Sequence, residues 1–385
     1  MASKPSLAPS KISRTTISFL LSLYPHTIKE FYRTKLIAKS TSKASTLPAS
    51  KRSTAKGKNE ETIEKEVEAF LKLDKLRYEA IPAALKSRPG IVPATGKNDE
   101  GKAKEDGKRP DKKAKVIKNE DDLPPSGPFL EKDEIVNLMD WKLKHGSHRP
   151  ALMGMIRSNP DSLVQSTTRT AFSQLQTTLS NTGNEAFPAA PLETLTGPLR
   201  GVGPATASLF LSVAPCQNSS DDAYNMNINA APFFSDELFN WLCLDKYAHD
   251  LSNSSSGDDG GARSKGKSSV TTDAKIKYNM KEYRELWEAV VELRGRVNQI
   301  PDQKAVAGKG SGNEDESRSF SVLDIERVAF VIGHLDVSGY EEGMKEASMT
   351  GVLCDAKADD ASAVPVAATT DMKVVNAGRG KRKRG

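Results

Sequence analysis

The sequence predicts an all-α fold with long disordered insertions and disordered tails. Apolar residues recur at helical spacing in several segments, and no segment shows the alternation and hairpin turns typical of β-strands. The chain has 385 residues, of which only 37% are hydrophobic and 6% aromatic. This apolar content is too low for the whole chain to pack, so we expect one helical core separated by solvated segments.

Five amphipathic helices are predicted from apolar residues repeated every three or four positions. Their apolar faces span residues 63–78, 135–139, 164–179, 276–291 and 325–332. The first helix is expected to stop near Pro82, and the second to be capped by Asp133. Pro160 and Asp161 are a typical opening for the third.

Segments rich in Lys, Ser, Gly and acidic residues, without apolar periodicity, separate these helices. We therefore expect residues 1–60 to be a disordered basic arm and residues 61–346 to be a single all-α domain. That domain would be interrupted by disordered loops at 90–127, 252–272 and 301–318. Residues 347–385 would form a disordered tail, and either tail is a possible contact for protein partners.

The basic residues are concentrated at the ends of the chain. The net charge is +6, yet residues 1–58 hold twelve Lys and Arg against one acid, so the rest is acidic overall. The first 58 residues are rich in Ser, Thr and Lys, as mitochondrial transit peptides are. Residues 380–385 read Gly-Lys-Arg-Lys-Arg-Gly, a basic cluster typical of nuclear localisation. The nucleus is the predicted location, with the mitochondrion as the alternative.

Several classes of protein are excluded. No apolar run approaches the roughly 18 residues that a membrane helix needs. The three cysteines are widely spaced, which excludes a disulfide framework, a four-cysteine zinc site and a four-cysteine iron–sulfur cluster. His145 and His148 have no acidic or cysteine partner nearby in the sequence. We expect neither a metal nor a cofactor.

The most informative segment is residues 192–215. At its centre, Gly201 and Gly203 flank Val202, and Pro204 follows. A short helix is expected to end at Leu199, the glycines to form a tight turn, and a second helix to begin with Pro204 in its first turn. The free N–H groups at the start of the second helix would favour an anion such as phosphate.

This segment resembles the helix-hairpin-helix DNA glycosylase superfamily, which includes endonuclease III and adenine glycosylases. The matching residues are Leu199, Gly201-Val202-Gly203 and Thr206-Ala207. The resemblance implies an all-α, helix-hairpin-helix glycosylase-like domain that grips the DNA backbone through the hairpin. The implied contacts are Leu199, Arg200, Gly201, Val202, Gly203, Ala205 and Thr206.

The resemblance also implies a catalytic aspartate at the start of a later helix. Asp236 follows Ala-Pro-Phe-Phe-Ser and opens an amphipathic run, so it is the best match. It lies 33 residues after Gly203, farther than is usual in the family, and residues 217–229 are interpreted as an inserted polar loop. Asp221 and Asp222 are closer but lack the apolar-Pro context. The alternative for Asp236 is an ordinary acid that stabilises a helix end.

Related enzymes that also cut the DNA strand have a lysine where this chain has Ala205, so lyase activity from that position is not expected. Lys142, Lys144 and Arg149, close to Trp141, are possible DNA contacts. With three further arginines they could form a local basic face; the full set is Lys142, Lys144, Arg149, Arg157, Arg169 and Arg200. The alternative is that most of them are ordinary surface residues.

These observations predict a DNA-binding protein resembling monofunctional base-excision glycosylases, in which Asp236 assists hydrolysis of an N-glycosidic bond. The alternative is a catalytically inactive member of the same fold that binds nucleic acid or protein. The acidic balance of residues 128–250, with eight basic and thirteen acidic side chains, favours the alternative.

Overall fold

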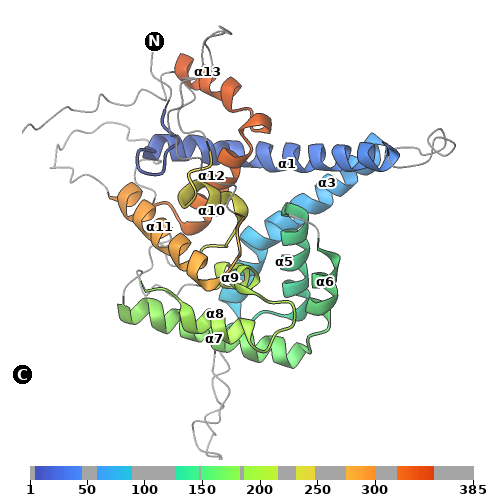
Figure 1. Ribbon diagram of the computed structural model, residues 1–385, viewed down its shortest axis with the longest axis vertical. Helices are drawn as coiled ribbons and strands as arrows, with labels where there is room; N and C mark the ends of the chain where they lie inside the picture. The colour runs from blue at the N-terminus through green and yellow to red at the C-terminus, as the bar shows by residue number, and fades with distance from the viewer. Residues whose placement is uncertain are drawn as a thin grey trace, which may run out of the picture.

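The computed structural model describes residues 5–45, 59–88, 127–146, 149–182, 186–215, 231–247, 275–299 and 319–350. All regular secondary structure in these ranges is helical, which confirms the all-α prediction (Figure 1). The α-helices are α1 (Arg14–Ser45), α3 (Glu60–Lys75), α4 (Ile81–Ser87), α5 (Lys132–His145), α6 (Pro150–Arg157), α7 (Asp161–Thr182), α8 (Ala189–Thr196), α9 (Pro204–Ser212), α10 (Asp236–Leu242), α11 (Met280–Asn298), α12 (Val322–Gly333) and α13 (Tyr340–Thr350).

Each of the five predicted helices is present, with different ends in three cases. The first does not stop at Pro82: a π-helical turn, Leu76–Ala80, joins α3 to α4, and Pro82 lies in the first turn of α4, where its missing N–H is harmless. Helix α5 is capped by Glu131, which forms a capping box with Glu134, and not by Asp133. Helix α11 begins at Met280, where Asn279 caps it.

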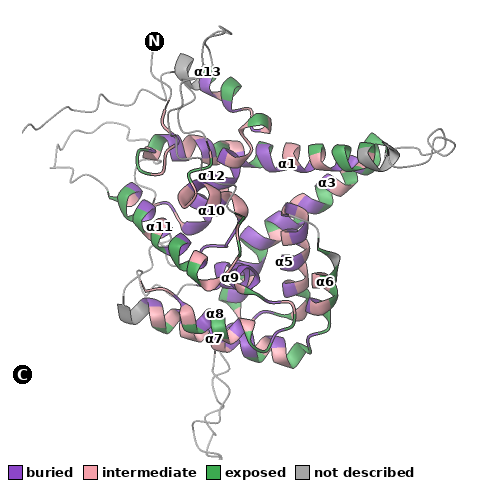
Figure 2. Ribbon diagram, viewed as in Figure 1, coloured by how far each residue is buried: buried purple, intermediate pink, exposed green. Residues whose placement is uncertain are grey.

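The prediction of a disordered arm over residues 1–60 is wrong for residues 14–45. These residues form α1, a helix of 32 residues that packs against α3 and α12 (Figures 1 and 2). Its apolar side chains recur at helical spacing and are buried: Ile17, Leu20, Tyr24, Ile28, Tyr32 and Leu36. The six Lys and Arg residues of this segment, and its many Ser and Thr residues, occupy other positions, so the composition concealed the apolar face.

Helix α1 also supports the wall of the site described below. Lys35 donates hydrogen bonds to the carbonyl oxygens of Lys144 and Gly146, both at 2.7 Å, at the end of α5. A lysine is well suited to this place because the last carbonyls of a helix lack partners within the helix and carry partial negative charge. The first helix is therefore part of the domain, whose core extends beyond the predicted boundary at residue 61.

Helix α9 lies in the centre of the molecule. Residues 205–212 are all buried, and the helix contacts α5, α7, α8 and α11. This environment explains why its sequence lacks a polar face. Helix α10 packs against α11 and α12, so the segment that leads into it passes beside α9 (Figure 1). None of the described helices has the length and apolar character required to cross a bilayer.

Candidate active site

The turn between α8 and α9 has the predicted hairpin form, although α8 ends at Thr196 and not at Leu199. Gly201 has a φ of +78°, a left-handed conformation that favours glycine, and a Cβ placed there would lie 2.9 Å from the Cβ of Met155. Gly203 has an extended backbone, and a Cβ there would meet nothing within 4 Å. Gly201 is therefore required by the fold, whereas Gly203 leaves open space beside the turn.

Asn159 holds the hairpin from the side. Its buried side chain accepts a hydrogen bond from the N–H of Arg200 at 2.8 Å and donates one to the Arg200 carbonyl at 3.1 Å. Both backbone groups of one turn residue are thus satisfied by a single amide. Sequence reasoning missed Asn159, because an asparagine before Pro160 is also an ordinary loop residue.

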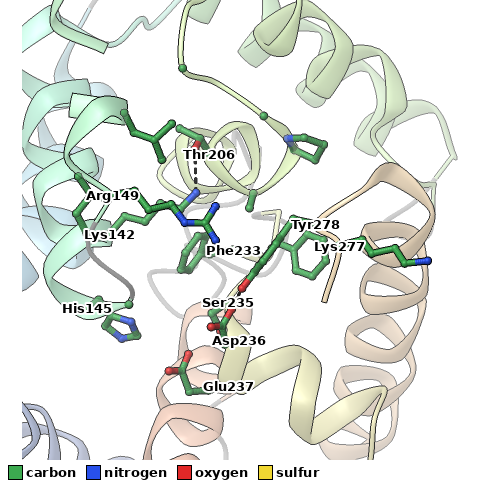
Figure 3. A pocket seen from close by; sticks show the side chains of 18 residues that line it. Lys142, His145, Arg149, Thr206, Phe233, Ser235, Asp236, Glu237, Lys277 and Tyr278 are labelled. Atoms are coloured by element: carbon green, nitrogen blue, oxygen red, sulfur yellow. Dashed lines mark hydrogen bonds between the residues drawn. The ribbon is translucent and has the colours of Figure 1, made fainter. Parts of the chain in front are cut away.

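A cavity of about 280 Å³ lies between the hairpin and the start of α10 (Figure 3). Asp236 and the hairpin residues Gly201, Gly203, Ala205 and Thr206 line the same cavity. The remaining walls come from the end of α5, from Arg149 and Leu152, from residues 233–237 and from Lys277 and Tyr278. This volume lies just below the roughly 300 Å³ at which the range for small-molecule sites begins.

Asp236 is the first residue of α10, but it is not the cap. Ser235 occupies the N-cap position, and its side chain accepts a hydrogen bond from the N–H of Leu238 at 3.1 Å. The carboxylate of Asp236 instead accepts a hydrogen bond from the hydroxyl of Tyr278 and borders the cavity. Burial and the charge of Asp236 raise the pKa of Tyr278, so this hydroxyl remains a donor.

Glu237 is a second acidic side chain at the cavity. Burial, reinforced by the neighbouring charge of Asp236, raises the pKa of Glu237 to about 7. Near neutral pH this carboxyl can therefore hold or release a proton, as an acid–base group does. Neither Glu237 nor Tyr278 was predicted as a site residue. Their place at the cavity becomes apparent only when the fold brings the start of α10 beside the residues that precede α11.

The predicted basic contacts divide into two groups. Lys142 and Arg149 line the cavity, and the Lys142 amine donates to the Thr206 hydroxyl at 2.8 Å. Burial, together with the charge of Arg149, lowers the pKa of Lys142 to about 7, while Asp236 opposes the shift. Lys144 does not line the cavity and pairs with Asp140 at 2.8 Å.

The prediction that Arg169 belongs to a local basic face is wrong. This side chain is buried, lies 4.5 Å from the ring of Phe129 and donates to the carbonyl of Gly127 at 3.3 Å. It therefore belongs to the packing of α7 and cannot reach a ligand on the surface. Arg157 and Arg200 are exposed.

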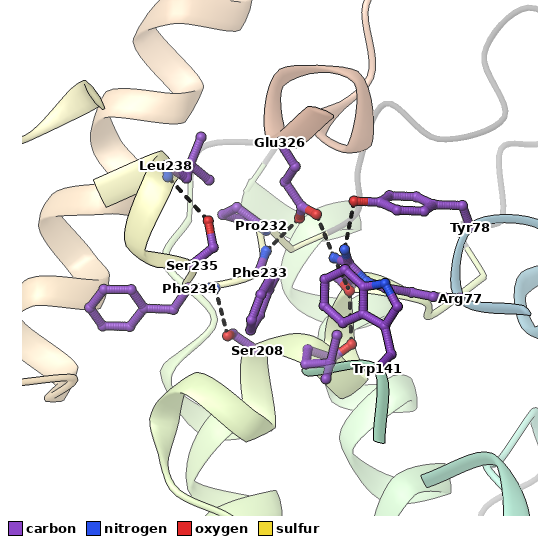
Figure 4. A network of polar contacts seen from close by, with 12 residues as sticks. Arg77, Tyr78, Trp141, Ser208, Pro232, Phe233, Phe234, Ser235, Leu238 and Glu326 are labelled. Atoms are coloured by element: carbon purple, nitrogen blue, oxygen red, sulfur yellow. Dashed lines mark hydrogen bonds and ion pairs between the residues drawn. The ribbon is translucent and has the colours of Figure 1, made fainter. Parts of the chain in front are cut away.

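The segment that precedes Asp236 is held by three helices (Figure 4). The Phe233 N–H donates to Glu326 of α12 at 2.6 Å, and the Phe234 N–H donates to Ser208 of α9 at 2.9 Å. The Pro232 carbonyl accepts from Tyr283 of α11 at 2.8 Å. Glu326 in turn forms a buried ion pair with Arg77. These bonds fix the backbone that presents Asp236 to the cavity.

The structure offers no metal site in the ranges it describes. His145 is buried, and its ring lies 4.5 Å from that of Trp141, which is buried in the core as well. Burial, together with the charge of Arg77, lowers the pKa of His145. No group of three or more His, Cys, Asp or Glu side chains there is arranged to hold an ion. His148, Asp221, Asp222 and residues 217–229 lie outside the described residues.

The described residues thus bring together two predicted features that are 33 residues apart in sequence, the hairpin and Asp236. They add a lysine, a tyrosine and a second carboxyl group that the sequence did not single out as partners of Asp236. Comparison of the chain with protein-family models, with curated proteins and with solved structures finds no match.

Proposed function

We propose that this protein binds duplex DNA through residues 199–206 and hydrolyses the N-glycosidic bond of one nucleotide with the help of Asp236. The observation that carries the proposal is the shared cavity, in which a carboxylate faces the hairpin. The resemblance of Leu199, Gly201-Val202-Gly203 and Thr206-Ala207 to the helix-hairpin-helix glycosylases supports the same assignment.

The geometry suits the chemistry. Departure of a base from its sugar develops positive oxocarbenium character, which a nearby carboxylate stabilises while it activates a water molecule. Asp236 is free of the capping role and is oriented by Tyr278. Glu237, with its pKa of about 7, is placed to supply a proton to the departing base. The target nucleotide has to leave the base stack to reach the cavity.

The proposed contact with DNA is local. The cavity side of the hairpin has open space at Gly203, which allows a phosphate to approach the backbone at the start of α9. The exposed side chain of Arg149 adds positive charge at the cavity rim. Since residues 128–250 are acidic overall, affinity should depend on these few contacts and not on bulk charge.

The second candidate function is an inactive module that binds nucleic acid or protein. The acidic balance of residues 128–250 favours it, because this surface would repel DNA outside the hairpin. The two candidates differ in one respect: only the enzyme requires the carboxylate of Asp236.

Placing a carboxylate at Gly203 should weaken the DNA contact. We expect wild-type binding to duplex DNA to weaken as salt is raised, and Gly203→Asp to weaken it by about tenfold or more at every salt concentration, because the new charge repels a phosphate. Fluorescence anisotropy with a labelled duplex over a salt series measures both effects. Gly203 tolerates a side chain sterically, so the variant should fold.

The matched control is Gly295→Asp. Gly295 is exposed on α11, and a Cβ there also meets nothing within 4 Å, so the control carries the same change of net charge away from the cavity. Its affinity should stay close to that of the wild type. Equal losses in the two variants, or no binding by the wild type, would contradict the proposed interface.

A further inference from the structure

Only one of the three lysines of α5, Lys142, lines the cavity. The other two form ion pairs with carboxylates of α5 and α7. The Lys142 amine instead donates to the Thr206 hydroxyl at 2.8 Å and lies 5.8 Å from the centre of the Phe233 ring (Figure 3). In the described part of the chain, this amine therefore has a neutral hydroxyl as its partner and no carboxylate.

The charged group that acts most strongly on Lys142 is itself a cation. The guanidinium of Arg149 points into the same cavity (Figure 3). Burial and this neighbouring charge lower the pKa of Lys142 to about 7, against the smaller opposing effect of Asp236. A large fraction of the amine is therefore neutral near neutral pH, and its nitrogen has a free electron pair with which to react.

The surroundings of Lys142 favour a negative charge at the end of its side chain. A guanidinium such as that of Arg149 pairs with a carboxylate through two parallel hydrogen bonds. Thr206 lies in the first turn of α9, where the helix carries partial positive charge. Its hydroxyl can also rotate to donate a hydrogen bond. The cavity thus offers a cation, a helix N-terminus and a donor to an anion formed on the Lys142 nitrogen.

We propose that Lys142 is a site of reversible carbamylation by carbon dioxide, and that the carbamate pairs with Arg149. The neutral amine adds to the carbon of CO₂, an N–C bond forms, and one C=O electron pair moves onto oxygen. The nitrogen releases a proton to water, which leaves a carbamate with one negative charge. Protonation of the nitrogen and loss of CO₂ return the amine, so the cycle requires neither an oxidant nor a cofactor.

Carbamylation changes the charge beside the hairpin. It replaces a neutral or positive amine by an anion next to Thr206, at the helix start where a DNA phosphate is proposed to bind. CO₂ should therefore weaken the binding of DNA. This effect rests on the proposed function, whereas formation of the carbamate does not.

Chemical trapping tests the site in the absence of DNA. The full chain is equilibrated with ¹³C-labelled bicarbonate, which supplies CO₂, and triethyloxonium converts any carbamate to a stable ethyl ester. Mass spectrometry of the digested chain then locates the label. We expect it at Lys142, with a yield that rises as the pH passes through about 7, because the neutral amine is the reacting form. Lys277 lines the same cavity but is exposed, so it is the internal reference and should carry much less label.

The matched variants are Arg149→Gln and Lys132→Arg. The first removes the cation that pairs with the carbamate, so the yield at Lys142 should fall by about tenfold. The second changes an ion-paired lysine of the same helix and should leave that yield unchanged. No label at Lys142, or equal labelling of Lys142 and Lys277, would overturn the inference. An undiminished yield in Arg149→Gln would overturn the pairing.

The effect on DNA is measured by fluorescence anisotropy with a labelled duplex, in bicarbonate and in chloride at the same pH and ionic strength. We expect bicarbonate to weaken binding by the wild type by about threefold or more, and to have no such effect on Lys142→Arg. An equal loss in Lys142→Arg would refute the effect on DNA. Absence of DNA binding in both salts would defeat the proposed function, while the trapping experiment alone decides on carbamylation.

Discussion

Asp236→Asn should abolish base release by this protein. The substitution keeps the size of the side chain and an acceptor for the Tyr278 hydroxyl, but removes the negative charge that stabilises the developing oxocarbenium ion. A loss of about 10²–10⁴-fold in the rate of base release is expected. The measurement is alkaline cleavage of duplexes that each contain one deaminated, oxidised or alkylated base, under single-turnover conditions.

The appropriate control for Asp236→Asn is DNA affinity, measured on the same preparation. The hairpin is unaltered, so the dissociation constant for duplex DNA should change by less than about threefold. The thermal midpoint should also be retained, because Ser235 and not Asp236 caps α10. A variant that releases the same base at the wild-type rate would show that Asp236 is a structural acid and would favour the non-catalytic alternative.

Arg77→Met should destabilise the fold by about 3–5 kcal/mol, since it leaves the charge of Glu326 buried without a partner. The two side chains are only 1% and 4% exposed. Burial already raises the pKa of Glu326 and Arg77 opposes the shift. Without Arg77 the native state should bind a proton more readily, so the loss of stability should shrink as the pH falls. Urea unfolding at pH 5 and pH 8 measures both effects.

The double variant Arg77→Met/Glu326→Gln separates the ion pair from the packing. Glutamine keeps an acceptor for the Phe233 N–H but carries no charge, so the double variant should be more stable than Arg77→Met alone. A cost of less than about 1 kcal/mol for Arg77→Met, or a double variant less stable than the single one, would contradict this role for the pair.

The features that were predictable from the sequence are local ones. The Gly-x-Gly-Pro pattern fixed the turn and the first residue of α9, because glycine and proline restrict the backbone independently of distant residues. Helical spacing of apolar residues located the cores of α5, α7, α11 and α12. The position of Asp236 at a helix start followed from the preceding Pro-Phe-Phe-Ser.

The features that escaped prediction depend on contacts between distant segments. Glu326 lies in an apolar run and reveals its role only when Arg77 and the Phe233 N–H, 249 and 93 residues away, are placed beside it. Asn159 reaches Arg200 in the same way. Helix α1 was missed for a different reason: its many lysines and serines resemble those of a solvated tail, while its apolar face is a narrow stripe.

The most direct test of the central claim uses a duplex in which one nucleotide is replaced by a cationic pyrrolidine ring, compared with the neutral tetrahydrofuran ring. The cation imitates the charge that develops during base release and requires no knowledge of the base recognised. We predict that the protein binds the cationic duplex about tenfold more tightly or better, a difference of about 1.4 kcal/mol, and that Asp236→Asn abolishes this preference. Equal affinity for the two rings, or a preference that survives Asp236→Asn, would contradict the claim that Asp236 stabilises the positive charge that develops on the sugar of the bound nucleotide.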